Sequence, residues 1–158
     1  MEPTKSELAL PTSSEMTSWQ RSLLNNLGHK RTILTLCQYY QRHAPAEEID
    51  FVALMNELLE IYPEEIADLS RLLRLYDVPP SEAEVLRHQV RDGRNRRTTL
   101  TRLEFLLSLT RANAGWYQRE LQREPPPDIA ALWTALLAAD NERIQRFGGL
   151  LNPESSPT

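Results

Sequence analysis

Several features that mark common enzyme classes are missing from this chain. It has one cysteine, Cys37, among 158 residues, so no intramolecular disulfide can form and nothing indicates an oxidising compartment. There is no glycine-rich phosphate loop, no nucleophile elbow and no zinc-type cysteine pair. Hydrolase and kinase interpretations therefore have no motif to support them.

Long apolar runs and a positive net charge are also missing. Near the N-terminus the longest apolar run covers residues 8–10, with Glu2 and Glu7 before it, which fits neither a secretory signal nor a membrane span. The formal net charge of −4 argues against a general nucleic-acid binder, which is usually basic. We therefore expect a cytoplasmic protein that binds neither membranes nor nucleic acids.

Leucine is abundant, glycine is scarce at 5 residues, and β-branched residues are few, which favours helices over strands. Apolar residues recur at helical spacing in four long stretches. These predict helices over about residues 17–43, 50–76, 82–123 and 129–147. Within the third stretch, Asp92 and Gly93 are expected to separate a short leading helix from a longer one that starts near Arg94.

Local signals define the expected helix ends. Thr17 or Ser18 can cap the first helix, and Ser81 with Glu84 has the spacing of a capping box for the third. The second and fourth helices are expected to be capped by Asp50 and Asp128, and residues 148–149, both glycine, should end the fourth. Pro63 should kink the second helix or start a new one. Gly28 either weakens the first helix or permits another helix to approach it closely.

Short connections make neighbouring helices antiparallel, so the predicted fold is all-α, an up-down-up-down four-helix bundle. The predicted bundle domain covers residues 17–151. Residues 1–16 are expected to form a flexible N-terminal arm and residues 152–158 a flexible C-terminal tail, because both are rich in proline, serine and threonine.

Each apolar stripe is interrupted near its middle by polar or charged side chains. In a helix bundle such positions can converge at the same depth. One interpretation is a buried network in which cations neutralise carboxylates without a metal, and another is that these side chains lie at stripe edges and reach solvent. A metal site of unusual composition is the third. The six residues are Lys30, Glu65, Asp68, Asn113, Asp140 and Arg143.

The second-helix segment Glu-Glu-Ile-Ala-Asp-Leu-Ser-Arg-Leu-Leu-Arg-Leu-Tyr-Asp-Val-Pro-Pro and the fourth-helix segment Ala-Asp-Asn-Glu-Arg-Ile-Gln-Arg-Phe resemble the ferritin-like superfamily, which includes rubrerythrin-like and di-iron carboxylate proteins. The resemblance covers roughly residues 18–150. It implies metal ligands in the pattern Glu, Glu-x-x-His, Glu and Glu-x-x-His on successive helices.

Compared position by position, only Glu65 matches a family ligand outright. Asp68 and Arg143 stand where the two histidines would be, Asp140 replaces the fourth-helix glutamate, and Lys30 replaces the first. Asn113 is our choice for the third-helix ligand. A protonated lysine or arginine cannot coordinate a metal.

The sequence therefore indicates a ferritin-like bundle with a degenerate site, no metal and no cofactor, acting as a non-catalytic scaffold or interaction protein. The first alternative is an iron- or manganese-dependent oxidase or iron-handling protein that uses Glu65, Asp68 and Asp140. The second is a binder of a small ligand in the bundle core.

Charge is distributed unevenly along the chain. Residues 47–68 carry acidic side chains and no basic one, whereas residues 87–111 are rich in arginine. We expect these two regions to complement each other across adjacent helices, since no stacking aromatics accompany the arginines as in a nucleic-acid site. An apolar patch at Trp116 would suggest a homodimer or another protein partner.

Overall fold

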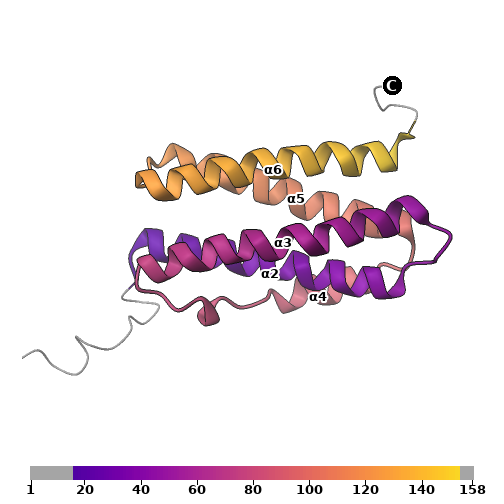
Figure 1. The fold of residues 1–158 in the computed structure, drawn as a ribbon, viewed down its shortest axis with the longest axis horizontal. Coiled ribbons are helices and arrows are strands. Elements are labelled where there is room, and N and C mark those ends of the chain that lie inside the picture. Colours follow the sequence, from indigo (N-terminus) through magenta and orange to yellow (C-terminus); the bar gives the residue numbers. More distant parts are fainter. Residues whose placement is uncertain (1–15, 154–158) are drawn as a thin grey trace, which may run out of the picture.

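The computed structural model describes residues 16–153, and within that range the chain is all-helical (Figure 1). This confirms the predicted all-α class. No helix in the described part is both long and apolar enough to cross a membrane. The elements are α2 (Ser18–His43), α3 (Ile49–Leu75), a 3₁₀ turn (Pro80–Glu82), α4 (Arg87–Arg94), α5 (Thr99–Gln122) and α6 (Pro127–Leu151).

Helix α2 begins where the sequence predicts. Thr17 caps it through a capping box with Gln20. Helix α3 begins one residue before Asp50, the predicted cap, and runs through Pro63 as one continuous helix, so no new helix starts at this proline. The last helix starts at Pro127 rather than after Asp128 and continues to Leu151. The predicted end at the two glycines is wrong, because neither of them adopts the positive φ that terminates a helix.

The connection between α3 and α5 differs most from the prediction. The expected capping box of Ser81 and Glu84 does not form, because residues 83–86 are extended and α4 starts only at Arg87. This extended strap crosses α2 at Gly28, where a Cβ atom would lie 2.7 Å from the carbonyl oxygen of Glu84. The amide of Leu86 donates to the Thr32 hydroxyl at 2.9 Å. Gly28 therefore permits a close approach of the strap.

The order of helix directions is not up-down-up-down. Contacts of Glu57 with Arg146 and of Glu65 with Arg143 show that α3 is antiparallel to α6. The short connection to α6 makes α5 antiparallel to α6 as well, so α3 and α5 run in the same direction (Figure 1). The prediction is wrong because residues 76–98 form a long crossover along the outside of α2, which returns the chain to the opposite end.

The interior contains two hydrophobic clusters along the length of the helices. One includes Leu36 and Phe51, and the other includes Leu27 and Trp133. Met16 packs into the second cluster with 8 % of its surface exposed, so this residue does not belong to a flexible arm. Residues 1–15 and 154–158 of the predicted arm and tail lie outside the described residues. Polar residues occupy the level between the two clusters.

Candidate functional site: a buried ring of charges

Four of the six polar residues singled out in the sequence meet between the two hydrophobic clusters. Lys30 comes from α2, Glu65 from α3, and Asp140 with Arg143 from α6. Lys30 and Asp140 are fully buried, and Glu65 and Arg143 expose less than a tenth of their surface. The interpretation that places these side chains at solvent-exposed stripe edges is therefore wrong for these four.

The four side chains form a closed ring of alternating charge. The Lys30 ammonium lies 3.2 Å from a carboxylate oxygen of Asp140 and 3.2 Å from one of Glu65. The Arg143 guanidinium donates two hydrogen bonds to Glu65, at 2.8 and 3.1 Å, and also donates to Asp140. Each charge thus has two partners of opposite sign, which is the condition under which buried charges persist.

Two tyrosine rings cover the cations of the ring. The Tyr62 ring centre lies 5.5 Å from the Lys30 ammonium and 4.8 Å from the Arg143 guanidinium carbon. The Tyr117 ring centre lies 5.5 Å from the Lys30 ammonium. These distances suit cation–π attraction, which strengthens when the cation is removed from water. The Tyr62 hydroxyl itself is buried without a hydrogen-bond partner.

The surroundings keep both cations protonated. Burial disfavours the ammonium of Lys30, but the facing oxygens of Tyr117, Asp140 and Glu65 outweigh burial and hold the Lys30 pKa above its ordinary value. The same opposition of burial and neighbouring oxygens raises the pKa of Arg143. Burial also raises the pKa of Tyr117 to about 12, so this phenol is neutral near pH 7.

Asp68 does not join the ring. Its side chain is 46 % exposed and pairs with Arg71 one turn further along α3. The buried stripe of that helix passes from Glu65 to Leu69 and leaves Asp68 on its flank. The assignment of Asp68 to a buried cluster is therefore wrong, and so is its use as a metal ligand beside Glu65.

Asn113 is buried on α5, but no hydrogen bond between its side chain and the four charged residues exists among the described contacts. Its amide nitrogen has no partner. Helix α5 therefore contributes the Tyr117 ring to the site and no charged group. The ring draws its charges from three helices rather than four.

A second polar network, which the sequence interpretation missed, lies next to the ring. The Asn26 amide donates to the Tyr117 hydroxyl at 2.7 Å, and the Trp133 indole donates to the Asn26 carbonyl oxygen at 3.0 Å. Asn26 lies four residues before Lys30, so both face the same side of α2. That spacing was a usable signal. The network connects α2, α5 and α6 through one side chain.

The donor set does not fit a di-metal centre. Only two carboxylates face each other in the ring, and each is already bound to both an ammonium and a guanidinium. A divalent ion would have to displace two cations that cannot coordinate it. No group of three or more metal-ligating side chains occurs in residues 16–153.

The remaining candidates are not activated for catalysis. Burial raises the pKa of the Cys37 thiol to about 12, so the thiol is protonated near pH 7 and is not activated as a nucleophile. Burial and the adjacent Lys30 charge lower the pKa of His29. Trp116 stacks edge-on against Trp133 and is only partly exposed, so it does not form an open apolar patch.

Comparisons with known proteins give no relative: no family model, curated protein or solved structure matches this chain.

Proposed function

We propose that this protein is a non-catalytic, ferritin-like helical scaffold or interaction protein in which ion pairs take the place of a di-metal centre. The connectivity supports the proposal. A single long crossover between the second and third long helices is the arrangement of ferritin-like bundles, and residues 76–98 form such a crossover between α3 and α5. The depth of the charges, midway along the helices, matches the depth at which such bundles build metal sites.

The observation that carries the proposal is the closure of the ring. Lys30 lies between Glu65 and Asp140, and Arg143 bridges the same two carboxylates from the other side. The cations neutralise the carboxylates, as a metal would, and they join α2, α3 and α6 at one level. A buried ion pair adds little net stability compared with apolar packing. The function we assign to the ring is to fix the relative register of these helices.

A catalytic role has little support from the ring. A substrate would have to reach side chains that are 0–10 % exposed. The Tyr62 and Tyr117 hydroxyls have pKa values raised by burial, which opposes the ionisation a general base requires. A buried, unreactive Cys37 is compatible with the cytoplasmic location that we propose for this protein.

Metal analysis of wild-type protein purified without chelator tests the proposal. We expect no stoichiometric iron, manganese or zinc. The matched variant Lys30→Glu with Arg143→His restores the residue types that the resemblance implies at those two positions. This variant removes both cations and should gain affinity for divalent ions, measured by calorimetric titration with Mn²⁺.

Stoichiometric metal in the wild type that is lost in Glu65→Gln would overturn the proposal. The surface variant Asp68→Asn is the control, because its carboxylate lies off the ring and pairs with Arg71. It should leave the metal content of either background unchanged.

A further inference from the structure

The arginines around α4 have no acidic partners among the described residues. The side chains of Arg87, Arg91 and Arg94 border a surface hollow of about 400 Å³ whose apolar wall is formed by Val85 and Val90. All three arginines are exposed, and no ion pair between described residues involves any of them. We call this surface of α4 the basic surface.

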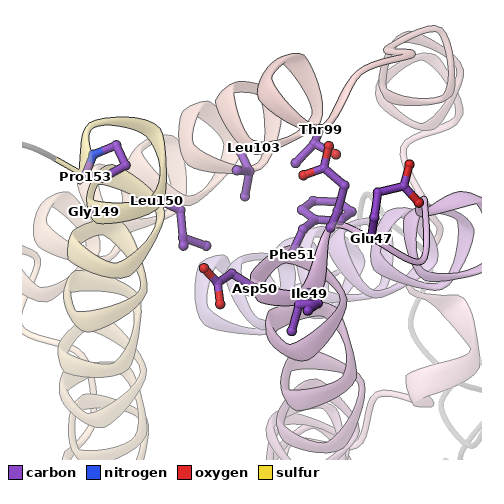
Figure 2. Close-up of a pocket in the computed structure, with 10 residues that line it drawn as sticks. Glu47, Ile49, Asp50, Phe51, Thr99, Leu103, Gly149, Leu150 and Pro153 are labelled. Atoms are coloured by element: carbon purple, nitrogen blue, oxygen red, sulfur yellow. The ribbon is translucent and has the colours of Figure 1, made fainter.

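An acidic hollow lies at the end of the molecule where α3 and α5 begin and α6 ends. It encloses about 540 Å³. Figure 2 shows Asp50 of α3 facing Leu150 of α6, and Phe51 and Leu103 also line the hollow. Glu47, Glu48 and Asp50 take part in no ion pair between described residues. We call this hollow with its three carboxylates the acidic surface.

Exposed apolar groups accompany the acidic surface. Ile49 lines the hollow and is 72 % exposed, and Leu100, in the first turn of α5, is 55 % exposed. Among the described residues only one other large apolar side chain, Leu75, is comparably exposed. A hollow with an apolar interior, exposed apolar neighbours and a charged border is typical of a protein contact, which combines an apolar centre with a polar rim.

The two surfaces do not pair within one chain. The basic surface is on α4, which packs chiefly against α2 (Figure 1), and no ion pair between described residues joins it to the acidic surface. The acids of residues 47–68 that do form ion pairs use other partners: Glu57 pairs with Arg146, Glu65 pairs with Lys30 and Arg143, and Asp68 pairs with Arg71. The expectation that the acidic and arginine-rich regions complement each other inside one chain is therefore wrong for these exposed groups.

We propose that the acidic surface of one molecule binds the basic surface of a second copy of this chain. This inference names the partner for the interaction role proposed above and rests on that proposal. Three carboxylates beside the exposed Ile49 would face three exposed guanidinium groups beside Val85, so the charges of the two surfaces match. Guanidinium–carboxylate pairs add directional hydrogen bonds to the attraction.

A second copy fits better than a polyanion such as nucleic acid. The chain has a formal net charge of −4, so a polyanion attracted by the arginines is repelled by the rest of the molecule. A polyanion would also leave the acidic surface and Ile49 without a partner. A second copy of this chain carries a complement for each of the two surfaces.

Charge reversal followed by mixing tests the contact. The acid-reversed variant carries Glu48→Arg and Asp50→Arg, and the base-reversed variant carries Arg87→Glu and Arg91→Glu. Sedimentation equilibrium of the wild type at low ionic strength should show a mass that rises with concentration, and high salt should reverse this rise. The association constant of each variant alone should be at least about tenfold lower than that of the wild type, because like charges then face each other. An equimolar mixture of the two variants should recover association.

The control for total charge is Glu64→Arg with Asp68→Arg, an exposed and a partly exposed position on α3 outside the acidic surface. It makes the same change in net charge as the acid-reversed variant and should associate like the wild type. A wild type that stays monomeric at every concentration, or reversals that leave association unchanged, would overturn the inference. So would binding of heparin by a wild type that remains monomeric. Metal content measured on the same samples tests the proposed function separately.

Discussion

The ring and the surface pair Asp68–Arg71 use the same chemical groups in opposite environments. In the ring, Lys30 and Asp140 have no exposed side-chain surface. On the surface of α3, the Arg71 and Asp68 side chains are 69 % and 46 % exposed. An exposed pair of this kind contributes little, about 0–1 kcal/mol, because water and salt screen it. Burial makes the loss of any single member of the ring costly, since a charge left alone there cannot be hydrated.

Breaking the ring by the single substitution Lys30→Ala should have the largest effect on stability. It leaves Glu65 and Asp140 buried with one cation, Arg143, between them. We expect the free energy of unfolding in urea to fall by roughly 3–5 kcal/mol.

The matched control for this change is Arg71→Ala, which removes a cation of the surface pair. Its effect should stay within about 0.5 kcal/mol, as for most exposed substitutions. Equal losses for the two variants would remove the distinction between the ring and the surface pair.

Replacing the whole ring should cost far less than breaking it. The fourfold variant Lys30→Met, Glu65→Leu, Asp140→Leu and Arg143→Met leaves no unpaired charge, so its free energy of unfolding should equal or exceed that of the wild type, by up to about 4 kcal/mol. If the ring sets helix register, this variant should show broadened amide resonances. Sharp, wild-type-like spectra would show that apolar packing alone defines the register.

A second pair of matched positions contrasts a crowded site with an open one. Gly28→Ala places a methyl group against the carbonyl of Glu84 in the strap and should destabilise the protein by about 1–3 kcal/mol. Gly148→Ala on α6 meets no atom within 4 Å and should stabilise the helix by about 0.4–1 kcal/mol. Thermal melts of both variants measure the difference. A gain in stability for Gly28→Ala would show that the strap is loosely held.

The smallest expected effect on stability at neutral pH comes from the loss of protons at and beside the ring. This effect grows at alkaline pH. The pKa values of Lys30 and Tyr117 are raised in the folded protein, that of Tyr117 to about 12. Between the ordinary values near pH 10 and these higher ones, the folded state keeps protons that the unfolded state loses. The free energy of unfolding should therefore fall as pH rises above about 10.

Urea titrations at pH 8 and at alkaline pH measure this fall. Tyr117→Phe removes one of the groups whose pKa is raised in the folded protein and should make the pH dependence shallower, whatever its effect at pH 8. If the free energy of unfolding of Tyr117→Phe falls with pH as steeply as that of the wild type, this tyrosine is excluded as a source of the pH dependence.

Helical periodicity predicted the helical stretches and singled out the four residues of the ring. It left open whether side chains such as Lys30 and Asp140 pair in the interior or lie at stripe edges, because an interrupted apolar stripe fits both arrangements. Asp68 was misplaced because a three-residue step from Glu65 leaves the buried stripe, whose next member is Leu69. Tyr62 and Tyr117 fit the apolar stripes as core aromatics, and their role above the cations depends on contacts between helices.

The direction of α5 could not be predicted from local signals. Residues 76–98 contain helix-favouring segments, and a capping box at Ser81 and Glu84 would have continued a helix antiparallel to α3. The strap forms instead because it finds partners far away in sequence, namely Gly28 and the Thr32 hydroxyl. Arg31 adds hydrogen bonds to the carbonyls of Pro80 and Ala83. Such tertiary contacts override local propensity.

Each charge of the ring is paired with two charges of opposite sign, and this arrangement also has an evolutionary consequence. Because removing any one of Lys30, Glu65, Asp140 and Arg143 leaves one uncompensated charge in the interior, a lineage that replaces them one at a time passes through a poorly folded intermediate. These four codons should therefore change together or stay together, so that the quartet is inherited as a single epistatic unit.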